Sequence, residues 1–453
     1  MRRKEIDEIL QHSKTAFEDI ADQIWSFAET NFKEYRSCAL QAAYMEKQGF
    51  RITTPIAGMD SAFIAEWGYG KPVIALLGEF DALANQSQIA NAEDASPLVP
   101  GAPGHGCGHN MLGTGCMEAA CAVKEYLESR GLTATVRYYG CPAEEGGGGK
   151  IFMAIDGAFD DVDCTFTWHP GNFNGIDVNA RAIISVYFRF TGIAAHATGA
   201  PWSGRSALDA VELMNVGVNF LREHVKPDTH MQYAIIDSGG PAANVVQKNA
   251  EVYYILRSRD EAYLREVYDR VCDIARGAAL MTGTKLEEPV IASAYATQIR
   301  SETLERITMD NLKAYLPFSY SEEELAYLKK YQLLGTEPTA KSPVYDGIDD
   351  GSIRAVSSDV ADVSWFAPLS QLRCQTVAVG TPSHSWLVTA QGKSSTAYKG
   401  MHAAGAIMAN CILDVIEDPA LLDRCQADFR RNLGDRRYKT MMEGHKPSDF
   451  RYD

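Results

Sequence analysis

Residues 134–149 read ATVRYYGCPAEEGGGG: an apolar run, two adjacent glutamates and four consecutive glycines. The apolar run predicts a buried strand, and the glycines are typical of a backbone that approaches another group closely. Three further apolar runs predict strands of the same kind: residues 72–78, 163–168 and 374–380. Helical patterns lie between some of them, notably residues 111–130, with Gly131 as the expected C-cap. Strands that alternate with helices predict an α/β sheet covered on both faces.

Each predicted strand leads into side chains that can bind a metal or carry a proton. In chain order, the four strand ends lead into Glu79 and Asp81, Glu144 and Glu145, His169, and His384. Ligands of open α/β sheets collect outside the carboxyl ends of the strands. Chance would scatter such side chains along the strands, so their position predicts one site at one edge of the sheet.

The run GHGCGHN, residues 104–110, adds a thiol and two imidazoles in a loop separated by glycines. Cys107 alone would more often be a buried thiol, but a glycine on either side and His109 two residues later favour metal binding. Zinc and similar ions take Cys, His and carboxylate ligands, and a catalytic site also needs a base beside the reacting water. His105 either orients a ligand or fills a tight turn. Together these stretches predict a metal-dependent hydrolase.

Length, charge and cysteine usage restrict the alternatives. A chain of 453 residues predicts two domains. The net charge of −16 argues against a general nucleic-acid partner, although a few local cations could still hold a small anionic substrate. Residues 403–416 are too short an apolar stretch to span a membrane, so no membrane partner is expected. The start shows no signal peptide, and the ten scattered cysteines then favour a reduced, cytoplasmic protein.

The sequence pattern changes in the middle of the chain. Residues 183–190 alternate apolar and polar side chains, which is typical of a half-exposed antiparallel strand, and helical and strand patterns follow. We therefore expect two domains of the α/β class. A catalytic domain with a mixed sheet would contain residues 1–182 and 296–453, and an α+β lid and dimerisation domain, residues 183–295, would be inserted in it.

Six motifs occur in the order expected of one enzyme family. In chain order they are GHGCGHN, PAEEGGGGK, WHPG, GIAAHATGAPWSGRSALDA, NVVQKNAEVYYILRSRD and GTPSHSW. In these motifs the sequence resembles the M20-type metallopeptidases and amidohydrolases, and the resemblance covers essentially the whole chain. Several separated motifs in one order are far more specific than any single motif.

The resemblance implies a centre of two divalent metal ions, zinc or manganese. The positions that match its ligands are Cys107, His109, Glu145, His169 and His384. Glu144 matches the catalytic general base. Two adjacent carboxylates leave the backbone in different directions, so Glu145 can bind metal while Glu144 stays free to accept a proton from water.

The resemblance also assigns roles within the inserted domain. It implies that His196 and Asn244 reach the scissile carbonyl or its oxyanion, and that Arg257, or Arg259 in its place, pairs with the substrate carboxylate. A capped turn for His196 and a surface salt bridge for Arg257 are the alternative interpretations. In this family the histidine often comes from the partner of a dimer, so we expect a homodimer or a related second subunit.

The substrate class implied by the resemblance is an N-acyl amino acid, with p-aminobenzoyl-glutamate as the first candidate. A dipeptidase or an aminoacylase with another substrate is an alternative, and so is a non-catalytic subunit of a hetero-oligomer. The intact base Glu144 weighs against the last. Five further residues have roles that the sequence leaves open: Glu79, Asp81, Asp359, Asp362 and His402. Glu79 stands where the family has an aspartate. The two later aspartates either support a ligand or cap a helix, capping being the simpler role, and His402 has either a structural role or supports a ligand.

Overall fold

The computed structural model describes residues 2–352 and 356–449, which form two compact units. The first unit contains residues 2–179 and 446–449 and the described part of 298–438; the second contains residues 180–297 and 439–445. The sequence boundaries of 183–295 lie inside the second unit. Residues 439–445 also belong to the second unit, although the sequence predicted them as part of the catalytic domain.

The first unit is an α/β domain built on a seven-stranded mixed sheet. The strand order is β1-β2-β4-β3-β5-β12-β6, with parallel pairing between β4, β3, β5 and β12 and antiparallel pairing at both edges. The strands, in that order, are Arg51–Thr53, Phe63–Gly68, Thr135–Cys141, Val73–Glu79, Cys164–Gly171, Leu369–Gln375 and Gly175–Asp177. The central strands are buried on both faces, as their continuous apolar runs predicted.

Two strands differ from their predicted positions. The last strand, β12, ends at Gln375, whereas the sequence predicted residues 374–380. Its polar side chains are buried because other segments satisfy them: Ser370 bonds Thr308, and Gln375 donates to the carbonyls of Pro343 and Val377. Strand β5 runs on to Gly171, so His169 lies within the strand and not after it.

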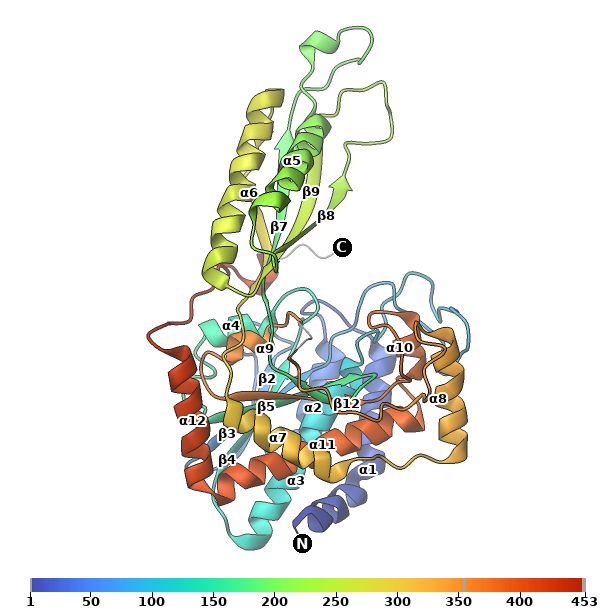
Figure 1. Cartoon of the computed structure of the whole chain (residues 1–453), viewed down its shortest axis with the longest axis vertical. Coiled ribbons are helices and arrows are strands. Elements are labelled where there is room, and N and C mark those ends of the chain that lie inside the picture. Colours follow the sequence, from blue (N-terminus) through green and yellow to red (C-terminus); the bar gives the residue numbers. More distant parts are fainter. Residues whose placement is uncertain (1, 353–355, 450–453) are drawn as a thin grey trace. The chain divides into compact units, whose positions relative to one another are not determined.

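Three long helices, α1 (Arg2–Phe27), α3 (His109–Arg130) and α11 (Ser395–Glu417), pack on one another, and α3 and α11 also pack against the central strands (Figure 1). Gly131 ends α3 in the left-handed conformation, as predicted. The other helices of this unit are α2 (Tyr35–Lys47), α4 (Gly149–Ile155), α7 (Glu302–Tyr315), α8 (Glu322–Leu334), α9 (Val360–Val363), α10 (Trp386–Gln391) and α12 (Pro419–Leu433), with a short 3-10 turn at Pro447–Asp449.

The second unit is an α+β domain with an antiparallel sheet in the order β10-β7-β9-β8, and β11 pairs with β7. The strands are β7 (Ala182–Thr191), β8 (His230–Asp237), β9 (Asn249–Ser258), β10 (Lys285–Leu286) and β11 (Val290–Tyr295). Two helices, α5 (Ala207–Leu221) and α6 (Glu261–Thr282), pack on this sheet, and 3-10 turns lie at Pro201–Ser203 and Arg222–His224. The side chains of Ser206 and Asp260 cap the two helices by accepting backbone N–H bonds.

Candidate metal centre

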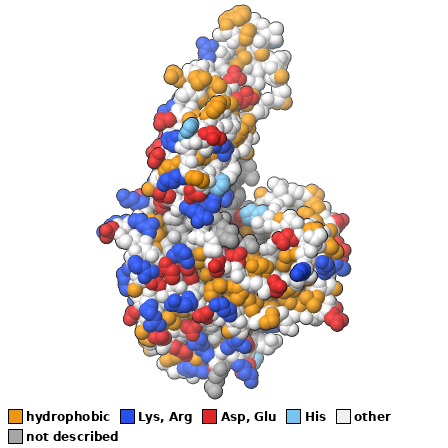
Figure 2. Space-filling view, in the orientation of Figure 1, with side chains coloured by type: hydrophobic (Ala, Val, Ile, Leu, Met, Phe, Trp, Pro, Cys, Tyr) orange, Lys and Arg blue, Asp and Glu red, His pale blue; other side chains and the backbone are white. Residues whose placement is uncertain are grey.

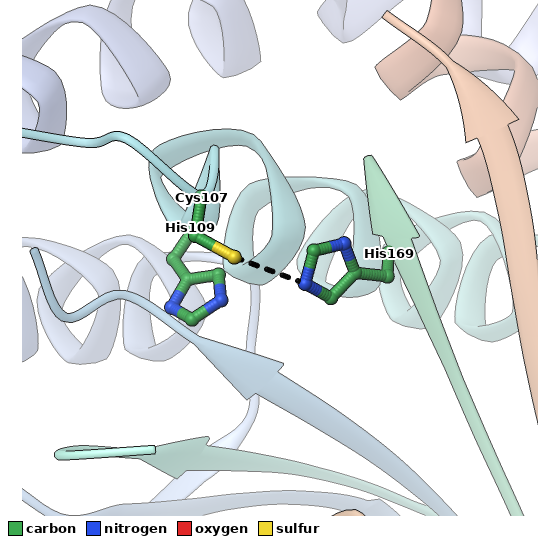
Figure 3. Close-up of side chains that lie close together, drawn as sticks. All are labelled: Cys107, His109 and His169. Carbon is green, nitrogen blue, oxygen red and sulfur yellow. Dashed lines mark hydrogen bonds between the residues drawn. The ribbon is translucent and has the colours of Figure 1, made fainter. Parts of the chain in front are cut away.

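Three of the predicted ligands meet where α3 begins. Cys107 lies in the loop before this helix, His109 is its first residue, and His169 lies in β5. Their ligand atoms all lie within 4.8 Å of one another, and Cys107 Sγ is 3.3 Å from His169 Nε2 (Figure 3). Such a group of one thiol and two imidazoles has the chemistry of a zinc-type site.

A second group shares Cys107 and adds Glu145 and His384, again with all ligand atoms within 4.8 Å. Glu145 lies in the turn after β4, and His384 lies in the loop before α10. The backbone N–H of His384 donates to the carbonyl of Gly106 at 3.0 Å, and its φ of 54° is in the left-handed region. This bond holds the His384 loop against the Cys107 loop. The structure therefore brings all five predicted ligands together.

Both imidazoles of the first group have one nitrogen fixed by the protein. Nδ1 of His169 donates to the carbonyl of Pro170 at 2.7 Å, which leaves Nε2 with a free lone pair. Nδ1 of His109 lies 2.9 Å from Asp81 Oδ1, and Nε2 of His109 has no hydrogen-bond partner among the described residues. A carboxylate or carbonyl behind each imidazole is the usual support of a metal-binding histidine.

Asp81 connects two of the ligand segments. It is 2% exposed, its Oδ1 faces His109, and its Oδ2 accepts the backbone N–H of Glu145 at 2.8 Å. Burial acts to lower the pKa of His109, but its interactions with Cys107 and Asp81 outweigh burial and raise this pKa well above the ordinary value. The sequence left the role of Asp81 open, and the structure shows it orienting a predicted ligand from behind.

Two buried atoms of the donor set show that it fits a metal ion. His109 Nε2 and Glu145 Oε1 are buried, lack hydrogen-bond partners among the described residues, and lie 3.9 Å apart. Buried polar atoms without partners are costly, and a divalent cation between them would satisfy both. Sulfur, nitrogen and carboxylate oxygen together fit zinc, and manganese would also be tolerated. The residues therefore fit the group that the sequence predicted.

Burial favours the neutral forms of two of the predicted ligands, Cys107 and His169. Burial, followed by the charge of Glu145, raises the pKa of the Cys107 thiol. Burial, followed by the positive charge of Arg373, lowers the pKa of His169 well below its usual value, so this imidazole is neutral. A cation in the site would favour the thiolate, because a bound metal reverses the local preference for neutral groups.

Glu144 belongs to a third group of neighbouring atoms, with Glu79 and His109. Burial, then the charges of Glu79 and Glu145, raise the pKa of Glu144 well above its ordinary value. Glu79 Oε2 lies 3.3 Å from His109 Nε2, which places Glu79 at the centre, although the sequence left its role open.

Lys150 is a buried residue at this centre that the sequence analysis missed. Its ammonium is fully buried, 2.7 Å from Glu79 Oε1 and 2.6 Å from Asp359 Oδ1. Asp359 also accepts the backbone N–H of Lys150 at 2.9 Å and makes no capping bond to α9, so the capping role suggested for it is wrong. Asp362, the other candidate cap, instead accepts the hydroxyl of Tyr438. A lysine directly after four glycines, at the start of the apolar run IFMA, was the available signal.

Two other histidines lie outside the centre. His105 Nε2 donates to the carbonyl of Ile24 at 3.0 Å, and burial lowers its pKa to about 4, so it anchors the loop to α1 as a neutral side chain. His402, on α11, lies between Glu118 at 2.8 Å and Glu18 at 3.2 Å. Burial acts to lower the pKa of His402, but the two glutamates outweigh it and raise the pKa.

The predicted residues of the second unit lie in two places. His196 and Asn244 lie in two loops that are joined by backbone hydrogen bonds, and Arg257 lies in β9. Backbone bonds connect the two loops: His196 bridges Val245, and Ala197 N–H donates to the carbonyl of Asn244 at 2.9 Å. Nδ1 of His196 accepts the backbone N–H of Gly199 at 3.0 Å, so it caps the turn, as the alternative interpretation held. The same bond leaves the proton on Nε2, where it can be donated.

A small cavity adjoins the predicted ligands in the first unit. It has a volume of about 270 Å³ and is bordered by Cys107 and His169. Phe173, Val377 and Pro382 supply apolar walls, and Arg373 is the cation in its lining. The sequence gave no sign that these residues share a cavity.

Surface and compartment features were also predicted from composition. Basic and acidic side chains are interspersed over much of the visible face in Figure 2. No helix in residues 2–352 and 356–449 is both long and apolar enough to cross a membrane. All ten cysteines are free thiols.

The chain matches the model of peptidase family M20/M25/M40 over residues 75–374. The chain belongs to this family. It is accordingly a metal-dependent amidohydrolase, as the motifs predicted. The resemblance drawn from the sequence is confirmed.

Known relatives and a solved structure agree with this assignment. The chain is 42% identical over 454 residues to one of the subunits of the p-aminobenzoyl-glutamate hydrolase of Escherichia coli, covering 94% of each chain. It is 28% identical to the Xaa-Arg dipeptidase of Mus musculus, covering 90% of this chain and 88% of the dipeptidase. A dinuclear metal binding M20 peptidase from Bacillus subtilis has the same fold, with a TM-score of 0.59 at 17% identity, over 90% of this chain and 99% of that one.

Proposed function

We propose that this enzyme hydrolyses the amide bond of p-aminobenzoyl-glutamate, releasing p-aminobenzoate and glutamate. The observation that carries the proposal is the pair of ligand groups that share Cys107, with Glu144 beside them. The chain that contains them is 42% identical to one subunit of a hydrolase named for this substrate. The cavity of about 270 Å³ beside Cys107 and His169 has apolar walls that suit an aromatic acyl group.

Two divalent metal ions would be held by Cys107, His109, Glu145, His169 and His384. When bound, they would polarise the scissile carbonyl and acidify the attacking water. The two ligand groups support a two-metal centre because they share only the thiol of Cys107 and otherwise use different side chains. The mixed donor set favours zinc and tolerates manganese.

Glu144 is the general base of the proposed reaction. Its carboxylate accepts the proton of the attacking water and then passes it to the nitrogen of the leaving glutamate. The pKa of Glu144 is raised, which is consistent with this role. Bound metal ions would favour its ionised carboxylate, and the neighbouring carboxylates keep that carboxylate basic.

The second unit would act as the lid and dimerisation domain, residues 183–295 in the sequence analysis. His196 supplies an N–H from Nε2 and Asn244 an amide N–H to the oxyanion of the tetrahedral intermediate, and Arg257 binds the substrate carboxylate. The capped Nδ1 of His196 supports this role, because it keeps the donor on the exposed nitrogen.

We further propose that the enzyme self-associates through β8. This strand is an edge of its sheet, since it pairs only with β9 among the described residues. Tyr233, Ile235 and Ile236 on it are 41%, 43% and 54% exposed, and such an apolar edge is suited to pairing with a second copy. A related second subunit is the alternative partner, because the relative from Escherichia coli is named as one subunit of its hydrolase. The thiol ligand and nine further free cysteines favour the reducing cytoplasm as the compartment.

The adjacent glutamates provide the test. Purified enzyme is freed of metal, reloaded with zinc or manganese, and assayed for release of p-aminobenzoate. Glu144→Gln should lower kcat by at least about 100-fold with metal content unchanged, because only the base is lost. Its neighbour serves as the matched control: Glu145→Gln should lose metal affinity as well. Full activity in Glu144→Gln would refute the assignment of the base.

A dipeptidase is the second candidate, favoured by the 28% identity to the Xaa-Arg dipeptidase over 90% of the chain. The two functions differ in the amino acid that is released. Release of arginine from dipeptides at a higher kcat/KM than release of p-aminobenzoate would select the dipeptidase.

A further inference from the structure

The sheet of the second unit has two different faces. Along β9 the side chains of Ala250, Val252, Tyr254 and Leu256 are fully buried. The alternate positions Tyr253, Ile255 and Arg257 are half-buried and lie on the opposite face, since successive side chains of a strand point to opposite sides. Tyr187 of β7 lies on this second face too, with its ring 4.6 Å from that of Tyr253.

Two arginines share this second face. Arg257 of β9 is directly opposite Ile183 of β7. Arg181 directly precedes β7, two residues before Ile183, so the alternation of this strand continued by one residue would place it on the same side, and its charge acts on Arg257. Both arginines are half-buried. The Nε atom of each is buried and has no hydrogen-bond partner among the described residues.

Neither arginine has a carboxylate partner in the described part of the chain, whereas most of its other half-buried arginines do. Arg2, Arg137 and Arg373, for example, each contact a carboxylate. Burial and then the charge of Arg181 lower the pKa of Arg257, so the two cations act on one another. The surface salt bridge suggested for Arg257 from sequence is therefore wrong.

Two neighbouring guanidinium groups with buried, unpaired N–H atoms form a site for anions. A guanidinium binds one carboxylate in a forked, charge-assisted arrangement, so two of them match two carboxylates. A single carboxylate would leave one half-buried cation uncompensated, which is unfavourable. Tyr253 and Tyr295 lie close enough to interact electrostatically with Arg257 and add hydroxyl groups to the same region.

We propose that Arg181 and Arg257 form a dicarboxylate site that selects substrates whose released amino acid carries a second carboxylate, as glutamate does. Arg257 binds the main-chain carboxylate and Arg181 binds the side-chain carboxylate. This inference rests on the proposed amidohydrolase function for its substrate and adds Arg181 as the residue that determines specificity.

The test compares p-aminobenzoyl-glutamate with p-aminobenzoyl-glutamine, which lacks only the second negative charge. Binding is measured by calorimetry with the metal-loaded Glu144→Gln enzyme, so that hydrolysis does not interfere, and kcat/KM is measured with Glu144 intact. Arg181→Gln should weaken binding of the glutamate compound by about tenfold and leave binding of the glutamine compound within about twofold. Arg257→Gln should weaken both.

Two further variants make the result specific. Arg189 lies within β7, eight residues after Arg181, and is opposite Glu251, so Arg189→Gln should change neither affinity. Arg181→Lys keeps the charge without the fork and should give an intermediate preference. Equal effects of Arg181→Gln on both compounds, or no effect on either, would overturn the inference.

The experiment separates this inference from the proposed function. If the wild-type enzyme hydrolyses neither compound but binds the glutamate compound in a way that depends on Arg181, the dicarboxylate site stands and the proposed reaction fails. If both compounds are hydrolysed with a ratio that Arg181→Gln leaves unchanged, the reaction stands and the dicarboxylate site fails.

Discussion

Asp81→Asn is the substitution that tests the architecture of the metal centre most directly. The carboxylate uses both oxygens as acceptors, 2.9 Å from His109 Nδ1 and 2.8 Å from the backbone nitrogen of Glu145. An asparagine of the same shape has one oxygen and one NH2 group. If the amide oxygen faces His109 Nδ1, the NH2 group faces the backbone N–H of Glu145, and two donors meet. If the oxygen instead faces Glu145, the NH2 group donates to His109 Nδ1, and the imidazole proton moves to Nε2, the ligand atom.

The expected loss of metal affinity follows from the loss of one of these two hydrogen bonds. One charge-assisted hydrogen bond in a buried site contributes about 1.5–3 kcal/mol, which corresponds to a loss of roughly 10- to 100-fold in metal affinity. Asp81 is 2% exposed, so solvent cannot replace the missing bond. Metal affinity is measured by competition with a chelator, and kcat is measured separately at saturating metal.

A matched control comes from Asp163, which accepts the backbone N–H of Val73 at 2.7 Å near the far end of β3. Asp163→Asn should lower the stability to urea with unchanged metal affinity. If Asp81→Asn binds metal as tightly as the wild type, then Asp81 does not set the orientation of His109, and the reasoning about the centre is wrong.

Three other perturbations follow from the same structure. Lys150→Met should lower the free energy of unfolding by about 3–5 kcal/mol in urea titrations, because two buried carboxylates lose their cation; an unchanged midpoint would contradict this. The folded-state pKa of His402 is raised, so its two bonds to glutamates stabilise the fold fully below the unfolded pKa of about 6.5 and less as the pH rises through the folded value. The stability difference between wild type and His402→Gln should therefore shrink from pH 6 towards pH 9, and a difference that grows would refute the ion pairs. Gly149→Ala would place a Cβ atom 2.2 Å from the carbonyl oxygen of Pro142, which must displace the turn that carries the adjacent glutamates; kcat should fall by roughly 100-fold, and wild-type kcat would exclude this close approach.

The sequence predicted those parts of the structure that depend on local pattern. Buried strands have continuous apolar runs, and the ligands lie in short motifs with unusual glycine content, so both were visible before the structure. The position of β12 was predicted wrongly because its buried polar side chains find partners in distant segments. Periodicity cannot show that Ser370 will meet Thr308.

The partners of the centre were less visible than the ligands. Lys150 and Asp359 are separated by 209 residues, and only the fold brings the ammonium of one to the carboxylate of the other. In the second unit, Arg181 also lies outside every motif, and only the pairing of β7 with β9 brings the start of β7 beside Arg257. Such pairings depend on tertiary contacts, which a single sequence does not encode in any local signal.

The place of β12 in the sheet has a consequence for the biosynthesis of the enzyme. This strand lies between β5 and β6, although it is made almost two hundred residues after them. While the ribosome is still translating the second unit, β5 and β6 have no strand between them, and His384 does not yet exist. Because chains fold from the N-terminus during synthesis, the nascent enzyme holds four of its five candidate ligands in an incomplete sheet. A centre that uses all five side chains could therefore be completed only late, when nearly the whole chain has left the ribosome.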